Sequence, residues 1–350
     1  MGTANIQKPD IKPAWQLEME RATPTPPWIV PATVAAWESQ KKEIRARLWE
    51  LLGSMPPRPT KLVVKTLSRE DRGDYVVEQF EFDNGAGARV PGYLLLPKGG
   101  TAPYPAILHC HWHGDEYSIG KEEIFQKAHT PEAPGPMFAR RGYAVMAIDA
   151  YCFGERNGKG PGGSRELGAG GESTASKFNL WLGRTLWGMI LRDDLMALDY
   201  LSSRPEVDSA RIGVTGISMG ATRAWWLMAL DDRPRTGVPM ACMTRYQNLI
   251  AHESLSAHGI YYFVPGMLRY FDTEAVVACI APRPILFMTG DQDSGSPPDG
   301  VVAIGEAVKP VYRLHGKEEA FQSILYPGIG HACTPVMWEK LQAWMDRQLH

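Results

Sequence analysis

One stretch constrains the fold of this chain more than any other: Arg211-Ile-Gly-Val-Thr-Gly-Ile-Ser-Met-Gly-Ala221. Its first part, Ile212–Thr215, is a short apolar and β-branched run, typical of a strand that is buried on both faces. The next five residues match G-x-S-x-G, and a helical pattern continues to Leu230. A serine between two glycines on a sharp strand-to-helix turn is a nucleophile elbow. The pattern therefore predicts Ser218 as a nucleophile that a strained turn raises above a sheet.

Short apolar segments recur along the chain, and longer connections separate the later ones. After residue 100 these segments are 106–110, 143–148, 212–215, 238–243, 285–289 and 323–326. Such an alternating strand–helix series is typical of a largely parallel sheet with helices on both faces. Three earlier segments, 62–67, 75–82 and 90–96, lie close together, and Asp83-Asn84-Gly85 between the last two is a hairpin signal. We therefore predict the α/β class, with a mostly parallel central sheet and antiparallel N-terminal strands.

The first 60 residues differ in composition from the rest of the chain. Residues 1–31 are polar and rich in proline, which predicts an extended surface arm with Trp15 and Trp28 as candidate anchors. A helix is expected over 32–52, where apolar residues recur at helical spacing up to Gly53. We therefore divide the chain into an arm and helix, residues 1–60, and a catalytic domain, residues 61–350.

Two segments of the catalytic domain interrupt the alternation of strands and helices. The segment 153–179 is rich in glycine and poor in large apolar residues, so it is predicted to be a long surface loop. The segment 244–271 is rich in tyrosine and histidine. It is either a lid insertion or a locally packed connector, and loops of this length are often functional.

The overall composition excludes several classes of partner. The 350 residues carry a net charge of −2, which gives no reason to expect nucleic acid or an anionic membrane surface. The five scattered cysteines suggest buried thiols rather than a disulfide framework. No signal-peptide pattern and no membrane-length apolar run is present, so a cytoplasmic location is expected. A secreted or periplasmic location stays open for a chain whose signal has been removed, and no pattern indicates the oligomeric state.

A serine hydroxyl needs a base beside it and a carboxylate behind that base. On a sheet with a nucleophile elbow, the partners follow in the order serine, acid, histidine, each after a strand. Asp293 follows the strand 285–289, and His331 follows the last predicted strand. We therefore predict Ser218, Asp293 and His331 as a catalytic triad. Asp291 and then Asp299 are the alternative acids, and Asp293 has the alternative role of a helix N-cap.

An oxyanion hole needs two backbone N–H groups that point at one site. Met219, directly after the nucleophile, is expected to supply the first. The second should come from the loop after the strand 106–110, and His113 is the first choice, with Trp112 as the alternative.

The same loop allows a different chemistry. His109, His111 and His113 alternate and precede Asp115, and an H-x-H-x-H pattern could hold zinc. A zinc-dependent hydrolase is therefore an alternative function, although no further ligand pattern accompanies the cluster. Buried, hydrogen-bonded histidines are the plainer explanation. We expect neither a metal nor an organic cofactor.

Taken together, these motifs resemble the α/β-hydrolase superfamily over about residues 62–349. Besides the elbow, the matching motifs are 111–114, 147–156, 184–189, 192–194, 290–293 and 330–331. Within the superfamily, the chain resembles the dienelactone-hydrolase-like and acetyl-xylan-esterase-like serine esterases. It departs from relatives at Trp112, where glycine is common, and from true dienelactone hydrolases at Ser218, where those enzymes have cysteine.

The resemblance implies a serine carboxylesterase for small acyl esters, with acetyl esters of carbohydrates as candidate substrates. Trp112, Trp187 and Tyr246 are candidate substrate-binding residues, because aromatic rings stack on sugars, and core packing is their alternative role. A catalytically inactive hydrolase fold that binds a partner is the remaining alternative function.

Overall fold

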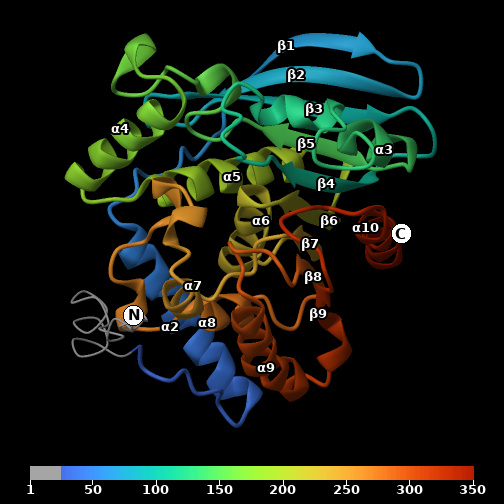
Figure 1. Ribbon diagram of the computed structural model, residues 1–350. Coiled ribbons are helices and arrows are strands. Elements are labelled where there is room, and N and C mark those ends of the chain that lie inside the picture. The colour runs from blue at the N-terminus through green and yellow to red at the C-terminus, as the bar shows by residue number, and fades with distance from the viewer. Residues whose placement is uncertain (1–24) are drawn as a thin grey trace, which may run out of the picture.

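A nine-stranded sheet organises residues 25–350, the part of the chain that the computed structural model describes (Figure 1). The spatial order is β1-β2-β3-β5-β4-β6-β7-β8-β9. Neighbours from β1 to β5 pair antiparallel, and all pairs from β5 through β4 to β9 are parallel. The strands are β1 (Val64–Asp71), β2 (Tyr75–Asp83), β3 (Arg89–Pro97), β4 (Tyr104–Cys110), β5 (Ala144–Ile148), β6 (Val207–Ile217), β7 (Thr236–Met240), β8 (Ile285–Gly290) and β9 (Phe321–Tyr326). The predicted α/β architecture with antiparallel N-terminal strands is therefore confirmed.

Helices cover both faces of the sheet because the buried strands carry apolar side chains on both sides. In β4, for example, Ala106 and Leu108 join one apolar core while Ile107 joins the other. The first core includes residues of α2 (Val34–Leu52), α4 (Gly168–Trp181), α5 (Leu186–Ser203), α6 (Met219–Leu230), α8 (Thr273–Ala278) and α9 (Pro298–Leu314). The second includes residues of α3 (Pro134–Arg140) and α10 (Pro335–Leu349). None of the helices between residues 25 and 350 is both long and apolar enough to cross a membrane.

The helix expected over 32–52 is α2, and its buried face packs on the first core. Just before it, the ring of Trp28 packs edge-on against Trp37, with centroids 5.9 Å apart. The other candidate anchor, Trp15, lies outside the described residues. The contact of Trp28 therefore fixes where the chain reaches α2.

The prediction of a surface loop over 153–179 is wrong for its second half, which forms α4. The residues that α4 buries recur at helical spacing, but most are polar or small: Glu172, Ala175, Ser176 and Asn179. A search for apolar periodicity cannot detect such a face. Glycine is also a poor helix former, which hid the first turn of this helix.

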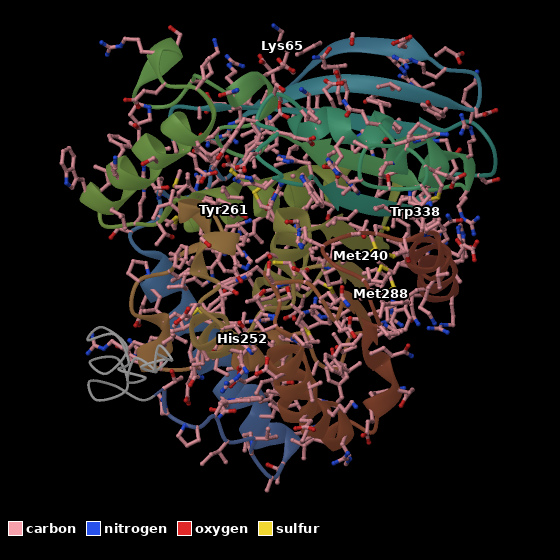
Figure 2. The ribbon with its side chains drawn as sticks, in the orientation of Figure 1. Lys65, Met240, His252, Tyr261, Met288 and Trp338 are labelled. Atoms are coloured by element: carbon pink, nitrogen blue, oxygen red, sulfur yellow. The ribbon has the colours of Figure 1, made fainter. Side chains whose placement is uncertain are left out.

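The segment 244–271 contains α7 (Tyr246–Ala251) and the short 3-10 helices η4 (Leu255–Ala257), η5 (Ile260–Tyr262) and η6 (Met267–Arg269). Of these, η5 packs against α4 and α5. Figure 2 shows the labelled Tyr261 beside these two helices. The remaining 3-10 helices are η1 (Gly120–Phe125), η2 (Gly154–Arg156), η3 (Gly163–Arg165) and η7 (Glu318–Ala320).

One buried ion pair joins two helices of the first core. Asp194 of α5 accepts two hydrogen bonds from Arg223 of α6, at 3.0 Å from Nε and 2.6 Å from Nη2. Both side chains are fully buried. A bidentate geometry of this kind offsets much of the cost of removing two charges from water. Removing one partner leaves the other charge buried and uncompensated.

We therefore predict that Asp194→Ala lowers the free energy of unfolding by about 3–5 kcal/mol. As a control, Asp74→Ala breaks the Arg140–Asp74 pair, in which both side chains are more than half exposed, and should change little. Denaturant unfolding of the two variants and the parent chain measures both effects. Equal stability of the Asp194 and Asp74 variants would contradict the prediction.

Candidate active site

Ser218 lies on the sharp turn between β6 and α6. Its backbone has φ 57° and ψ −119°, a region that residues other than glycine rarely adopt. The flanking glycines are required because β4 passes directly beneath. A Cβ at Gly216 would lie 2.4 Å from the carbonyl oxygen of Cys110, and a Cβ at Gly220 only 2.0 Å from it. The strained turn thus exists only because positions 216 and 220 carry no side chain.

Asp293 and His331 meet on the two turns that follow β8 and β9. The Nδ1–H of His331 donates to Asp293 Oδ2 at 2.8 Å. The second oxygen of Asp293 accepts the N–H of Gly295 at 2.9 Å, and the carboxylate is almost fully buried. A proton held on Nδ1 leaves Nε2 of His331 with its lone pair free, which is the tautomer that a general base needs.

The two alternative acids have other partners. Asp291 Oδ1 accepts the N–H of Gly328 at 2.8 Å and so ties the turn after β8 to the turn after β9. Asp299 accepts hydrogen bonds from His252 and Asn248 on the surface. The structure therefore brings Asp293, and neither alternative, to the histidine.

Ser218 and His331 line a common cavity of about 490 Å³. Its wall also includes residues of the loop after β4, of α4, of the segment 256–261 and of the turn 293–295. The hydroxyl of Ser218 makes no hydrogen bond to any residue between 25 and 350. Hydrogen bonds between a nucleophile and its base are often long without substrate and shorten in the complex. Both groups therefore border one space that is large enough to hold a small molecule.

The loop after β4, residues 111–115, is the oxyanion loop of the prediction. Its Trp112 N–H donates to Glu123 Oε2 at 2.6 Å and is therefore occupied. The backbone N–H groups of His113 and Met219 donate to no acceptor within residues 25–350. Met219 also begins α6, whose N-terminus favours negative charge. Of the two candidates in the loop, His113 is thus the one with a free N–H.

The three alternating histidines form separate hydrogen-bonded contacts. His109 pairs with Glu123 at 2.9 Å and His113 with Glu172 at 2.8 Å. Backbone groups occupy both ring nitrogens of His111, and burial lowers its pKa well below the ordinary value, so the ring stays neutral. Among the described residues, no group of three or more His, Cys, Asp or Glu side chains converges as a metal site would require. The zinc interpretation therefore fails because these nitrogens do not point at one place.

Of the three aromatic residues predicted to bind substrate, only Trp112 lines the cavity. Its ring stacks on His129, with centroids 4.1 Å apart and planes 3° from parallel. Trp187 is completely buried and packs edge-on against Trp226, so it belongs to the core. Tyr246 lines a different, apolar cavity of about 260 Å³. The prediction was wrong for Trp187 and Tyr246 because the sequence did not reveal which elements pack against these two rings.

The cavity wall includes polar and aromatic residues that were not predicted as site residues, among them Glu172, His258 and Tyr261. Glu172 belongs to the helix that was taken for a loop. His258 Nε2 donates to the carbonyl of Gly295 at 2.8 Å, which ties the segment 244–271 to the turn that carries the acid. Burial lowers the pKa of His258. The only available signal was the unusual density of tyrosine and histidine in that segment.

The chain matches known hydrolases over most of its length. A family model described as the Abhydrolase family matches residues 17–350. The Bacillus subtilis (strain 168) protein YtaP, which is provisionally named as a hydrolase, is 35% identical over 311 residues. That match covers 87% of this chain and 100% of YtaP.

Solved structures share the fold at lower identity. A Bacteroides fragilis NCTC 9343 protein, provisionally described as an acetyl xylan esterase, has a TM-score of 0.70 at 20% identity, over 89% of this chain and 81% of that one. A glucuronoyl esterase from Solibacter usitatus has a TM-score of 0.69 at 17% identity, over 93% of this chain and 99% of that one. At such identities the likeness shows the fold and not the substrate. With a family match over nearly the whole chain and YtaP covered from end to end, this chain belongs to the Abhydrolase family of α/β-hydrolases.

Proposed function

We propose that this protein is a serine carboxylesterase that hydrolyses small acyl esters through an acyl-enzyme. The observation that carries the proposal is the 2.8 Å hydrogen bond between His331 Nδ1 and Asp293 Oδ2, on the wall of a cavity that Ser218 also lines. A nucleophile on a strained elbow, a base with a free Nε2 and a buried carboxylate behind that base are the three parts that acyl transfer needs.

In the proposed reaction, Nε2 of His331 removes the proton from Ser218 Oγ as the oxygen attacks the ester carbonyl. The N–H groups of Met219 and His113 hold the negative oxygen of the tetrahedral intermediate. His331 then gives its proton to the leaving alcohol, and the acyl group stays on Ser218. Water repeats the same steps on the acyl-enzyme. Asp293 holds the imidazole in the required tautomer and stabilises the imidazolium.

The candidate substrates are acetyl esters of carbohydrates. Two lines of support exist: structural neighbours are described as acetyl xylan and glucuronoyl esterases, and the cavity combines aromatic rings with many polar groups. The ring of Trp112 offers a stacking surface, while Ser256 and His258 offer hydrogen-bonding groups. In this proposal the segment 244–271 acts as the lid and residues 61–350 are the catalytic domain, on which the described part of the arm and helix, residues 25–60, packs.

We expect Ser218→Ala to lower kcat for p-nitrophenyl acetate by roughly four orders of magnitude or more, because the covalent route is lost. The thermal midpoint should stay close to that of the parent chain. Ser203→Ala, which changes a serine whose hydroxyl bonds the carbonyl of Tyr200, is the control and should keep full activity. An active Ser218→Ala enzyme would show that the nucleophile lies elsewhere.

Substitution of the two aspartates in the turn after β8 should affect different properties, kcat in one case and stability in the other. Asp293→Asn should lower kcat by roughly four orders of magnitude, because an amide favours the wrong tautomer of His331. Asp291→Asn weakens the hydrogen bond to Gly328 and should cost about 1 kcal/mol of stability, with kcat nearly unchanged. Steady-state kinetics and thermal unfolding of both variants distinguish the roles. The reverse pattern would assign the acid to Asp291.

The charge of the cavity predicts a preference among esters of equal size. Its lining includes the carboxylates of Asp115, Glu172 and Asp293, and none of its described lining residues is lysine or arginine. We therefore expect kcat/KM for 2-sulfoethyl acetate to be roughly tenfold below that for neutral 3,3-dimethylbutyl acetate, and the gap to shrink in high salt. Acetylcholine, the cationic analogue, should not be disfavoured. Asp115→Asn should narrow the gap, and equal rates for the anionic and neutral esters would contradict the prediction.

A further inference from the structure

Two buried carboxylates bond to adjacent residues of the oxyanion loop, residues 111–115. Glu123 of η1 accepts a hydrogen bond from the backbone of Trp112 and pairs with His109 at the end of β4. Glu172 of α4 pairs with the side chain of His113 at 2.8 Å. Both glutamates are only 4% exposed. Burying a carboxylate is costly unless hydrogen-bond donors surround it, so each is a specific connection between the loop and its surroundings.

The hydrogen bonds of His113 fix its tautomer. The backbone N–H of Asp115 donates to Nδ1 at 3.1 Å, so Nδ1 carries no proton and Nε2 does. The Nε2–H then donates to Glu172 Oε2 at 2.8 Å. The hydroxyl of Tyr117 donates to the same oxygen at 3.4 Å. A single carboxylate oxygen therefore joins α4 to two residues of the segment after β4.

Aromatic contacts hold the ring of His113 as well. Tyr261, from the segment 244–271, stacks on the imidazole with centroids 4.9 Å apart and an angle of 21° between the planes. Tyr117 and Phe153 pack edge-on, each with its ring centroid 5.0 Å from that of His113. With both ring nitrogens bonded and three neighbouring rings in contact, the side chain has one orientation.

The backbone on both sides of His113 is held as well. The carbonyl of Trp112, which shares a peptide group with the His113 N–H, accepts from His111 Nδ1 at 2.7 Å, and the carbonyl of His113 accepts the N–H of Glu116 at 2.8 Å.

We propose that Glu172 is a positioning residue for the second oxyanion donor, acting through the His113 ring to keep the backbone N–H of His113 aimed at the reacting carbonyl. The inference rests on the proposed function, because it concerns the oxyanion hole of that reaction. An oxyanion donor acts only when its nitrogen lies about 2.7–3.1 Å from the oxygen with the N–H pointing at it, and loss of one donor typically lowers kcat by about 10²–10³. A loop that is free to shift by a fraction of an ångström loses part of that effect.

The test compares Glu172→Leu with Glu172→Gln, using neutral p-nitrophenyl acetate. Leucine fills the space without an acceptor, whereas the glutamine oxygen can still accept from His113. We expect Glu172→Leu to lower kcat by about 10- to 100-fold with KM changed less than threefold, because the interaction is made with the transition state alone. Glu172→Gln should keep most of the activity.

A Leu variant with kcat within threefold of the parent chain would overturn the proposal, as would a loss confined to KM. If the Leu variant does not fold, Glu172→Asp withdraws the carboxylate by one methylene and should show the same fall in kcat.

A double-mutant cycle tests whether Glu172 acts through His113. His113→Phe keeps a planar ring but removes the Nε2–H, so the double variant with Glu172→Leu should be no slower than the slower single variant. Losses in kcat that multiply would mean that Glu172 acts by another route, and would overturn the proposal.

Glu78→Leu is the matched control. Glu78 of β2 is also 4% exposed and pairs with Arg204, away from the loop. Its loss should lower the thermal midpoint without lowering kcat. Failure of the proposed function is seen separately, since it would leave Ser218→Ala active. An inactive Ser218→Ala enzyme together with a fully active Glu172→Leu enzyme refutes the positioning role alone.

Discussion

The close approach of β4 to the turn between β6 and α6 is the constraint on which the site depends. The carbonyl of Cys110 lies where any side chain at Gly216 or Gly220 would have to be. Because β4 and β6 are also paired as parallel neighbours, this contact fixes the end of β4 relative to Ser218. The loop that continues from β4 is the one that offers the free N–H of His113. One packing contact therefore sets the distance between the proposed nucleophile and the proposed oxyanion donors.

Three buried carboxylates hold the groups around that contact in place through hydrogen bonds. Asp293, Glu123 and Glu172 are each almost fully buried, and each accepts two hydrogen bonds from protein groups. A charge in a poorly solvated site strengthens such bonds and makes the loss of one expensive. The dipoles around the cavity are therefore held in place before substrate arrives, which is the condition for electrostatic stabilisation of a transition state.

The relation between fold and function has two parts in this protein. Family membership accounts for the sheet and for the strand–turn–helix at Ser218, but the same fold supports many reactions. Several polar and aromatic residues that line this cavity come from two elements outside the sheet. Glu172 lies on α4, while His258 and Tyr261 lie on the segment 244–271, and the two elements are in contact. Substrate choice should therefore depend on these two elements.

Most of the fold and the central three residues could be predicted from the sequence alone. Short β-branched runs, glycines at positions 216 and 220, and polar residues just after strands are local signals, and parallel strands must bring their carboxyl ends to one edge. Ser218, Asp293 and His331 follow from those signals together with chain order. The sequence favoured Asp293 over Asp291 as the residue further into the turn, and the structure places Asp293 against His331 while Asp291 bonds to Gly328.

What only the tertiary structure decided concerns side chains whose neighbours are distant in sequence. The buried face of α4 is polar, so apolar periodicity could not reveal the helix that carries Glu172. Trp187 and Tyr246 were predicted to bind substrate. The packing of their helices instead places Trp187 in the core and Tyr246 on the wall of a separate cavity. The histidines at 109, 111 and 113 resembled a metal site until each ring proved to have its own partner. Sequence spacing records which residues follow one another, whereas hydrogen bonding between distant elements decides which of them meet.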